Sequence, residues 1–327
     1  MAPLLSPPMN GAYINHLDSD AGMKTVLDNI PGSTTTDYLL LSLNVAGVDA
    51  NNKPSADINY GWNLPCTLAR DGKITDWTRD HLCKVVSAGV TQGKCKRVWL
   101  VIGGASDGPQ TDAFTNIQTI LDAGGTLAST LATNFKAIYF AINNITGVEA
   151  VGFDMDYEEN LDSLTAAVTN VSIFLFNNTA CSITFCPFQG EQDDQGNYPG
   201  EQAWINALKK VYSWTNGKVV GYNLQTYSGG GSNNPKQWAD YLADAGIVSD
   251  PYSFVWPIVS NGTDAATPSY EPSEVVKQLK NWGSATGPGN GFHSRGASLW
   301  ATSGLSDPPQ PPNTLAAYAN AIAQGIA

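Results

Sequence analysis

The sequence predicts an α/β protein, a single (β/α)8 TIM barrel that takes up residues 1–327 as one domain and carries no large α+β insertion. Three observations favour this fold. Segments typical of strands alternate eight times with segments of helical spacing. The chain has 327 residues, a length that one such barrel commonly fills, and it shows no linker or internal repeat. Chemically active side chains stand at the ends of several predicted strands, where such barrels place their sites.

The predicted strands are recognised by β-branched and aromatic residues between turn signals. Residues 11–16 follow a proline-rich start and mix both residue types. Residues 38–45 form a nearly unbroken apolar run, as expected for a strand that is buried on both faces in a parallel sheet. Residues 97–105 read as the third strand and end in glycines. The remaining strands are predicted at residues 151–159, 182–187, 218–227, 253–258 and 296–300.

The segments between the strands carry apolar residues at helical spacing. Residues 76–88 begin at Asp76, a possible N-cap, and are expected to stop at Gly89. Residues 112–144 are divided by two consecutive glycines into two helical pieces. Residues 46–74 hold Asn, Gly and Pro clusters and predict a long loop, and long loops in compact domains are usually functional. The other predicted helices are residues 160–178, 200–212, 235–245, 272–282 and 314–323.

The predicted strand at residues 151–159 carries three carboxyl groups at alternate positions, Asp154, Asp156 and Glu158. Successive side chains of a strand point to opposite faces, so these three line one face and the apolar residues between them line the other. An edge strand with a solvated acidic face is the alternative, but Asp is depleted in strands and like charges on one face repel each other. The pattern therefore favours a polar face that meets water or a substrate.

Three carboxyl groups on one face cannot all ionise easily. Each negative charge raises the pKa of its neighbours, so a proton is shared among them. A carboxylic acid that stays protonated near neutral pH is what general acid catalysis of glycosidic cleavage requires. The spacing of the carboxyl groups thus points to acid catalysis.

Residues 152–158, with the sequence G-F-D-M-D-Y-E, resemble the G-x-D-x-D-x-E core of glycoside hydrolase family 18, the chitinases and endo-β-N-acetylglucosaminidases. Two further strand ends are similar to those of the family. Gly103 and Gly104 match the glycines of the S-x-G-G sequence that ends its third strand. Gln225 and Tyr227 match the Q-x-Y sequence that ends its sixth strand. The resemblance covers most of the chain in outline, and the acidic motif is its most specific part.

The resemblance implies a mechanism that retains configuration without an enzyme nucleophile. In family 18 the N-acetyl carbonyl of the substrate itself attacks the anomeric carbon. By motif position, Glu158 would protonate the leaving oxygen. Asp156 would orient the acetamide and stabilise the oxazolinium charge, and Asp154 would sit beneath Asp156 and exchange a proton with it. No cofactor and no metal is expected.

The resemblance also implies a sugar-binding pocket around the acid. Tyr227 would hydrogen-bond the acetamide carbonyl, and Gln225 would line the same subsite. Trp300 would be the floor on which the bound sugar stacks, although a buried core indole is the alternative for this residue. Gly103 and Gly104 allow a close approach of the backbone, to a substrate or in a simple turn.

Two functions from different classes remain open. The first is a hydrolase that cuts β-1,4-linked N-acetylglucosamine in chitin, in chito-oligosaccharides or in the core of N-glycans. The second is a catalytically weak or inactive chitinase-like lectin or inhibitor on the same barrel. The usual sign of the second is loss of the Glu, and Glu158 is present. Three departures from the family pattern keep the second open: Val101 replaces a Ser, Val151 replaces an Asp, and Ser228 replaces an Asp or Asn.

The connection at residues 259–295 predicts the mode of attack. It must hold a helix, and too few residues remain for an added domain, which needs about 50. In the family that the chain resembles, enzymes that process a polymer from its end commonly carry an α+β insertion here, which forms one wall of a deep groove. The resemblance therefore implies a cleft that is shallow and open on that side, and an enzyme that cuts inside the polymer. In the long loop, Tyr60 and Trp62 could stack on sugar rings, and ordinary loop packing is the alternative.

Composition narrows the choice of partner. The formal net charge is −12 and the pI is about 4.5, and no run of Lys and Arg is long enough to follow a phosphate backbone. Nucleic acid and anionic membranes are therefore not expected as partners, and no stretch of about 18 apolar residues predicts a membrane span. The family resemblance, and not the composition, implies an oligo- or polysaccharide that contains N-acetylglucosamine as the partner, and a monomer is the expected state.

The cysteines and the N-glycosylation sequons are relevant to whether the protein is secreted. The five cysteines lack metal-type spacing, and one or two disulfides with a thiol left over, or five reduced thiols, are both open. Four sequons permit secretion without showing it. The resemblance implies a secreted protein whose signal peptide is absent from this chain, because the first residues lack a charged and a long apolar region. The cysteines are Cys66, Cys83, Cys95, Cys181 and Cys186, and the sequons begin at Asn144, Asn170, Asn177 and Asn261.

Overall fold

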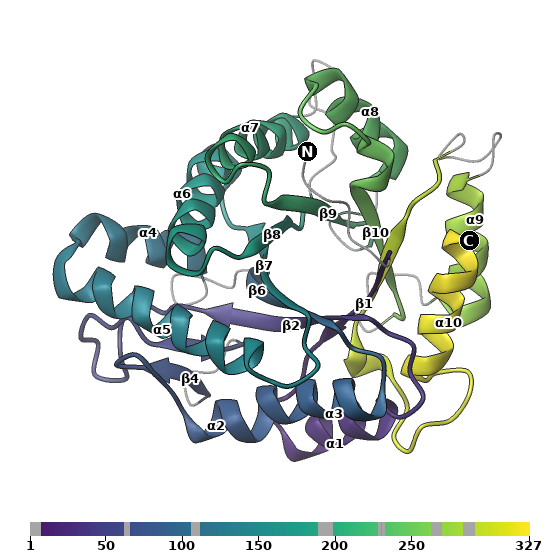
Figure 1. Cartoon of the computed structure of the whole chain (residues 1–327), viewed down its shortest axis with the longest axis horizontal. Helices are drawn as coiled ribbons and strands as arrows, with labels where there is room; N and C mark the ends of the chain where they lie inside the picture. Colours follow the sequence, from purple (N-terminus) through teal and green to yellow (C-terminus); the bar gives the residue numbers. More distant parts are fainter. Residues whose placement is uncertain are drawn as a thin grey trace.

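The computed structural model describes residues 8–61, 66–105, 112–188, 199–227, 230, 233–262, 270–283 and 292–327. Its centre is a closed barrel of eight parallel strands (Figure 1). The first strand pairs with both the second and the last, which closes the ring. The barrel strands are β1 (Met9–Ile14), β2 (Asp37–Asn44), β6 (Arg97–Ala105), β7 (Ala150–Glu158), β8 (Ser182–Phe185), β9 (Val219–Gln225), β10 (Val255–Ser260) and β11 (Gly296–Trp300).

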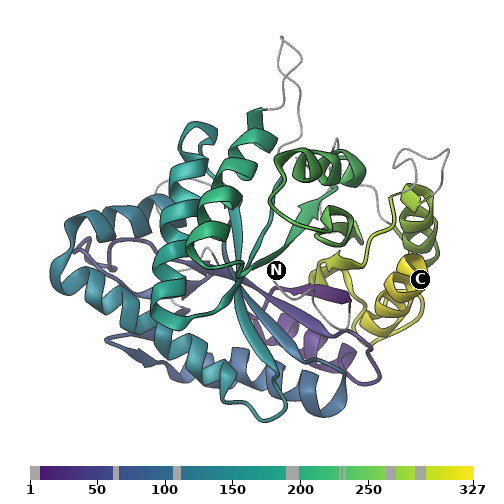
Figure 2. The same ribbon diagram turned by 45° about the horizontal axis from the view of Figure 1, so that its top comes forward.

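Helices surround the strands, and a turn of the molecule by 45° keeps the strands inside and the helices outside (Figures 1 and 2). Each helix buries one apolar side against the barrel, which is the arrangement that the alternating pattern predicts. The helices are α1 (Asp20–Asn29), α2 (Asp76–Thr78), α3 (Lys84–Gln92), α4 (Ala113–Ala123), α5 (Gly125–Asn143), α6 (Leu161–Thr179), α7 (Pro199–Trp214), α8 (Pro235–Ala245), α9 (Pro272–Gly283) and α10 (Leu315–Ile326).

The predicted (β/α)8 barrel is confirmed, and the predicted strands and helices lie within a few residues of the observed ones. The connection between β10 and β11 contains α9 and, in its described part, no further strand or helix. The helical stretch 112–144 divides at Gly124 and Gly125 as expected, and both glycines adopt a positive φ.

Residues 46–74 were predicted to form a loop, and this is wrong in part. They contain three short antiparallel strands that extend the sheet from β2: β3 (Ile58–Tyr60), β4 (Thr67–Arg70) and β5 (Lys73–Ile74). Asp71 and Gly72 form the two-residue turn between β4 and β5, both at positive φ. An Asp-Gly pair is a strong hairpin signal, because type I′ turns need this conformation at both positions. The sequence therefore held the signal for the hairpin.

Two helix predictions also change. Helix α1 was not predicted, and its N-cap Ser19 accepts a hydrogen bond from the backbone amide of Gly22. Gly89 was expected to stop a helix, but it lies inside α3. A Cβ atom at Gly89 would come within 2.3 Å of the ring of Tyr38, so a glycine is needed there for α3 to pack closely on β2.

Alternation along the strands separates two apolar regions. The larger one lies between the strands and the helices, and the smaller one fills the barrel interior with residues such as Leu39, Trp99 and Trp256. At the amino-terminal end of the strands, Arg97 donates two hydrogen bonds of 2.6 Å to Asp37. Both side chains are buried, and a buried bidentate pair of this kind fixes one arrangement of β2 and β6.

Glu201, in the first turn of α7, carries a buried carboxyl group. The residue is 2 % exposed, and its Oε2 atom has no hydrogen-bond partner in the described part of the chain. Burial raises the pKa of Glu201 to about 8. The folded state therefore holds this proton up to about pH 8, whereas the unfolded chain releases it near its ordinary pKa. The contribution of Glu201 to stability falls as the pH rises through this window.

Glu201→Gln is expected to raise the melting temperature at pH 8 by about 2–5 °C, because the amide cannot ionise in its buried position. At pH 4 the variant and the wild type should have the same melting temperature, because the carboxyl group is then protonated in both the folded and the unfolded state. Thermal melts of both proteins across this pH range measure the effect, with exposed Asp122→Asn as the matched control. A difference between Glu201→Gln and wild type that does not change with pH would show that ionisation of Glu201 plays no part.

Candidate active site

The three carboxyl groups of β7 share the inner face of the barrel, as the alternation predicts. Asp154 and Asp156 are buried and Glu158, at the carboxyl end of the strand, is half-buried. The apolar side chains between them belong to the outer core, against the helices. Val151 also belongs to the outer core. The residue that departs from the family motif at this place is therefore on the other face of the strand from the carboxyl groups.

Asp154 accepts hydrogen bonds from three strands. Its Oδ2 atom accepts from the hydroxyl of Tyr13 on β1 at 3.0 Å. Its Oδ1 atom accepts from the hydroxyl of Thr184 on β8 at 2.6 Å and from the amide of Asn223 on β9 at 3.0 Å. Burial raises the pKa of Asp154 to about 6, against the lowering effect of the three donors. With both oxygens accepting, the contacts favour the ionised form of Asp154.

Asp156 and Glu158 form a second layer above Asp154. The side-chain amide of Gln225, on β9, donates to Oδ1 of Asp156 at 3.1 Å and to Oε1 of Glu158 at 2.8 Å. Burial, followed by the charges of Glu158 and Asp154, raises the pKa of Asp156 well above its ordinary value. Burial also raises the pKa of Glu158. The two groups therefore titrate as a pair that retains a proton to higher pH than isolated carboxyl groups do.

Aromatic rings stand beside the carboxyl groups. Tyr227 and Trp300 stack with ring centroids 5.2 Å apart and an interplanar angle of 21°. Tyr13 lies against Trp300 at 5.3 Å, tilted by 59°. Trp300 is half-buried, so it is not the fully buried core indole that was the alternative. Burial raises the pKa of Tyr227 well above its ordinary value, so its hydroxyl is a neutral group that can donate. The predicted contacts of Tyr227 and Trp300 with a sugar stay predictions.

Gly103 and Gly104 end β6 beside the second layer. Gly103 pairs with Asp156 in the register of β6 and β7, and it adopts a φ of +89°. A Cβ atom there would lie 2.3 Å from the carbonyl oxygen of Asp156. The glycine thus allows β6 to approach the strand that carries the acids, and contact of either glycine with a substrate stays a prediction.

Val101 fills part of the barrel interior, where the family pattern has a Ser. It is fully buried and pairs with Asp154 in the register of β6 and β7. Its side chain offers no donor, and Thr184 and Asn223 supply donors to Asp154 from β8 and β9. The loss of a Ser hydroxyl therefore does not leave Asp154 without partners. Ser228, the third departure, lies outside the described residues.

Four residues of the site were not predicted from the sequence: Tyr13, Thr184, Asn223 and Cys186, whose sulfur lies 3.5 Å from the hydroxyl of Tyr13. Each lies on a predicted strand. Alternation along β8 gives one weak signal, since it places Thr184 and Cys186 on the same face. Sequence periodicity does not tell which strands meet β7, so it could not pair these donors with the carboxyl groups.

The side chain of Glu159, directly after β7, points away from the barrel interior and fixes the end of the strand. Its carboxylate accepts from the backbone amide of Phe114 at 2.7 Å and from the amide and hydroxyl of Thr115 at 3.1 and 2.6 Å. These groups belong to the first turn of α4, where a carboxylate satisfies amides that have no partner within the helix. The contact therefore holds the residue next to Glu158 in place.

Of the two alternatives for Tyr60, stacking on a sugar and packing within the protein, the structure shows packing. Tyr60 is 3 % exposed, its ring packs on Trp77 with centroids 5.0 Å apart, and its hydroxyl accepts from the backbone amide of Leu17. The residue is part of the outer core because β3 pairs with β2 and turns the ring inward. Trp62 lies outside the described residues.

All five cysteines are free thiols in the structure, which agrees with the second of the two open alternatives. For Cys181 and Cys186 the physical reason is distance. They flank β8, whose extended backbone separates their Cα atoms by about 16 Å, and a disulfide spans less than about 7 Å.

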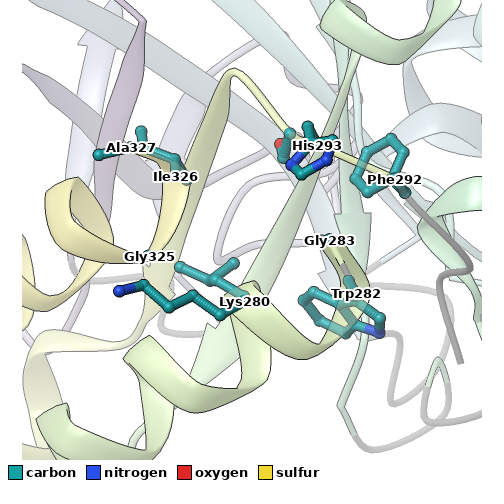
Figure 3. Close-up of a pocket in the computed structure, with 10 residues that line it drawn as sticks. Lys280, Trp282, Gly283, Phe292, His293, Gly325, Ile326 and Ala327 are labelled. Carbon is teal, nitrogen blue, oxygen red and sulfur yellow. The ribbon is translucent and has the colours of Figure 1, made fainter. Parts of the chain in front are cut away.

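A cavity of about 210 Å³ opens between α9, α10 and the segment before β11 (Figure 3). The strands are parallel, so this place at the start of β11 is at the opposite end of the barrel from Glu158. Its lining includes His293 and Lys280 together with Trp282 and Phe292. The cavity is thus separate from the carboxyl groups of β7.

The part of the chain that the structure describes gives two negative findings. None of its helices has the length and the apolar character needed to cross a bilayer. No group of three or more His, Cys, Asp and Glu side chains within it is arranged to hold a metal ion.

Comparisons with known proteins find similar solved structures but no similar sequence. No family model matches the chain, and no curated protein matches it. Among solved structures, a candidate chitinase A from Streptomyces coelicolor aligns over 97 % of this chain and 97 % of its own, with a TM-score of 0.52 and 17 % identity. The catalytic domain of a family GH18 chitinase from the fern Peteris ryukyuensis aligns over 96 % and 97 %, with a TM-score of 0.51 and 14 % identity.

A third similar structure is active domain 2 of a thermostable chitinase from Pyrococcus furiosus, in catalytic-site mutants complexed with chito-oligosaccharides. It aligns over 98 % of this chain and 95 % of its own, with a TM-score of 0.52 and 13 % identity. At these identities the likeness establishes the fold. The chain has the (β/α)8 fold of the family 18 chitinases over nearly its whole length.

Proposed function

We propose that this chain is a retaining glycoside hydrolase of the chitinase type, which cleaves β-1,4 linkages of N-acetylglucosamine with the help of the substrate's own acetamide group. The observation that carries the proposal is the stack of Asp154, Asp156 and Glu158 on the inner face of β7, with Gln225 bridging the upper two. Active sites of such barrels lie at the carboxyl ends of the strands, and Glu158 ends β7. The shared fold with chitinases supports the same reaction class.

Glu158 is the proposed general acid. Its raised pKa keeps a proton available, and the Gln225 amide occupies Oε1 as a donor, so the acidic proton belongs on Oε2. Glu158 is less buried than Asp154 and Asp156, as a group that must reach a glycosidic oxygen has to be. Transfer of this proton to the leaving oxygen breaks the glycosidic bond.

Asp156 is the proposed partner of the acetamide. When it is ionised, its carboxylate would hold the N–H of the acetamide, turn the carbonyl oxygen toward the anomeric carbon and stabilise the positive charge of the oxazolinium ion. Asp154, one layer deeper and held by three donors, would orient Asp156 through its charge. Proton exchange between Asp154 and Asp156 stays a prediction.

Tyr227 and Trp300 are the proposed walls of the sugar subsite. The neutral hydroxyl of Tyr227 can donate to the acetamide carbonyl, and the half-buried Trp300 ring offers a face on which a pyranose can stack. An N-acetylglucosamine-containing oligo- or polysaccharide is the proposed partner, and a chitinase with this fold has been crystallised with chito-oligosaccharides. We extend the proposal to internal cutting, because the described part of the connection between β10 and β11 holds only α9. A secreted monomer is proposed as well.

A turnover assay on a chito-oligosaccharide, beside an N-glycoprotein, tests the proposal. Early product should be the β-anomer, because attack by the acetamide followed by attack of water inverts the anomeric carbon twice. A proton NMR time course reads the anomer, and the viscosity of a soluble chitin derivative should fall before much reducing sugar appears.

Three outcomes of this experiment would contradict the proposal. Early α-anomer would mean an inverting enzyme, and the acetamide mechanism would fall. A viscosity that falls only in step with released disaccharide would refute internal cutting. Sugar binding without turnover of either substrate would favour the lectin or inhibitor alternative.

A further inference from the structure

Asn261 is a buried amide at the carboxyl end of β10 that the proposed mechanism does not yet use. It directly follows β10 and is 8 % exposed. It also begins one of the four sequons, which made it a candidate for carrying a glycan. The strands are parallel, so Asn261 lies at the same end of the barrel as Glu158, which ends β7, and Trp300, which ends β11.

Three hydrogen bonds join Asn261 to the chain at the end of β11. Its backbone amide donates to the carbonyl of Trp300 at 2.8 Å, which continues the pairing of β10 with β11 by one residue. Its Nδ2 atom donates to the carbonyl of Ala301 at 2.7 Å, and its Oδ1 atom accepts from the backbone amide of Ala301 at 3.3 Å. The side-chain amide thus binds Ala301 as a neighbouring strand would.

These contacts fix the peptide group that links Trp300 to Ala301. Its carbonyl oxygen accepts from the backbone of Asn261, and its N–H donates to the side chain of Asn261. The backbone conformation of a residue determines which side-chain rotamers it can adopt. Trp300 holds its ring 5.2 Å from that of Tyr227 and 5.3 Å from that of Tyr13, measured between centroids. Asn261 therefore fixes the backbone from which this ring extends.

We propose that Asn261 is a positioning residue for sugar binding, which holds the Trp300 ring in the orientation on which a pyranose can stack. The proposal rests on the proposed function for the stacking of the sugar, whereas the hold on Trp300 depends only on the contacts of Asn261. A buried side chain that is engaged in this way does not present its nitrogen to a glycan. The sequon at Asn261 is therefore expected to stay unmodified in the folded protein.

Asn261→Asp gives the first test. It keeps the size of the side chain, but an ionised carboxylate has no hydrogen to donate to the carbonyl of Ala301. A ring that is no longer held should bind the sugar less well in the ground state and in the transition state alike. KM for a chito-oligosaccharide should therefore rise about tenfold while kcat changes less than about threefold. A partly unfolded sample would instead lower the apparent kcat and leave KM unchanged.

Asn134→Asp is the matched control. Asn134 is fully buried in α5, which packs on β4 and β5. Its Nδ2 atom donates to the carbonyl of Ala56 and its Oδ1 atom accepts from the backbone amide of Gly72, both at 2.7 Å. The variant thus loses the same kind of hydrogen bond outside the barrel interior. It should lower the melting temperature and leave KM unchanged.

Fluorine NMR tests the positioning of the ring without turnover. With 5-fluorotryptophan at the nine tryptophan positions, the signal of Trp300 is the one absent from Trp300→Phe. In Asn261→Asp this signal should shift or broaden, because the ring leaves its fixed place beside the two tyrosines. In Asn134→Asp it should stay in place. If Asn261→Asp does not fold, Asn261→Ser replaces it with the same expectation, since serine is neutral and too short to bond both groups of Ala301.

The two measurements separate the positioning of Trp300 from the proposed function. A Trp300 signal that stays in place in the Asn261 variant, or that moves equally in Asn134→Asp, overturns the positioning role. A signal that moves while KM stays unchanged overturns the role of Asn261 in sugar binding. If the signal moves and wild type neither binds nor hydrolyses a chito-oligosaccharide, the hold of Asn261 on Trp300 stands and the proposed function falls.

Discussion

Glu158→Gln is expected to abolish hydrolysis while sugar binding survives. The amide keeps the shape of the side chain and can still accept from Gln225, but it has no acidic proton. General acid catalysis is typically worth a factor of 10² to 10⁴, so kcat should fall by about 100-fold or more. Initial rates on a chito-oligosaccharide measure the loss, and calorimetric titration with the same ligand measures the binding.

The neighbouring residue Glu159 gives a control with the same chemical change and other contacts. Glu159→Gln also replaces a carboxylate by an amide, but Glu159 holds the first turn of α4 outside the barrel interior. This variant should lose some thermal stability, and its rate should fall far less than that of Glu158→Gln, because Glu159 positions the end of β7 and supplies no proton to the reaction. A Glu158→Gln enzyme that keeps more than about a tenth of the wild-type rate would remove Glu158 from the acid role.

Asp156→Asn is expected to lower kcat by about 100-fold or more, because it removes the negative charge that stabilises the oxazolinium ion in a buried site. Its effect on pH dependence separates it from a structural defect. In wild type, activity should rise with pH as the pair of Asp156 and Glu158 loses its first proton and fall again as the pair loses its second. In the variant only Glu158 of this pair titrates, so the acid limb should disappear and an alkaline limb should remain.

The direction of the pKa shifts determines the pH range in which the active protonation state should be populated. Both carboxyl groups have raised values, so the active form, with Asp156 ionised and Glu158 protonated, should be populated at higher pH than ordinary carboxyl groups would allow. The kcat/KM profiles of wild type and variant, measured under identical salt, decide the point. The Asn side chain can still accept from Gln225, so the melting temperature should change little. An acid limb that persists unchanged in the variant would assign that limb to another group, and Asp154 would be the first to test.

The periodicity of the chain determined the fold and the central part of the site. Strands and helices alternate because apolar residues recur with period two in one and near four in the other, and these patterns are local. The same local rule placed Asp154, Asp156 and Glu158 on one face of β7, since backbone geometry alone turns every second side chain the same way. The Asp71-Gly72 hairpin and the Ser19 cap were equally local and were missed.

Only the tertiary structure decided what surrounds the carboxyl groups. Tyr13 reaches Asp154 across 141 positions of sequence, and Gln225 reaches Glu158 across 67. These contacts depend on the register of neighbouring strands and on the closure of β1 onto β11, which no segment encodes by itself. Burial is likewise a property of the whole barrel, and it is the largest cause of the raised pKa values. The sequence therefore determined which groups share a face, whereas the closed barrel decided their donors, their protonation and the place of Cys186 among them.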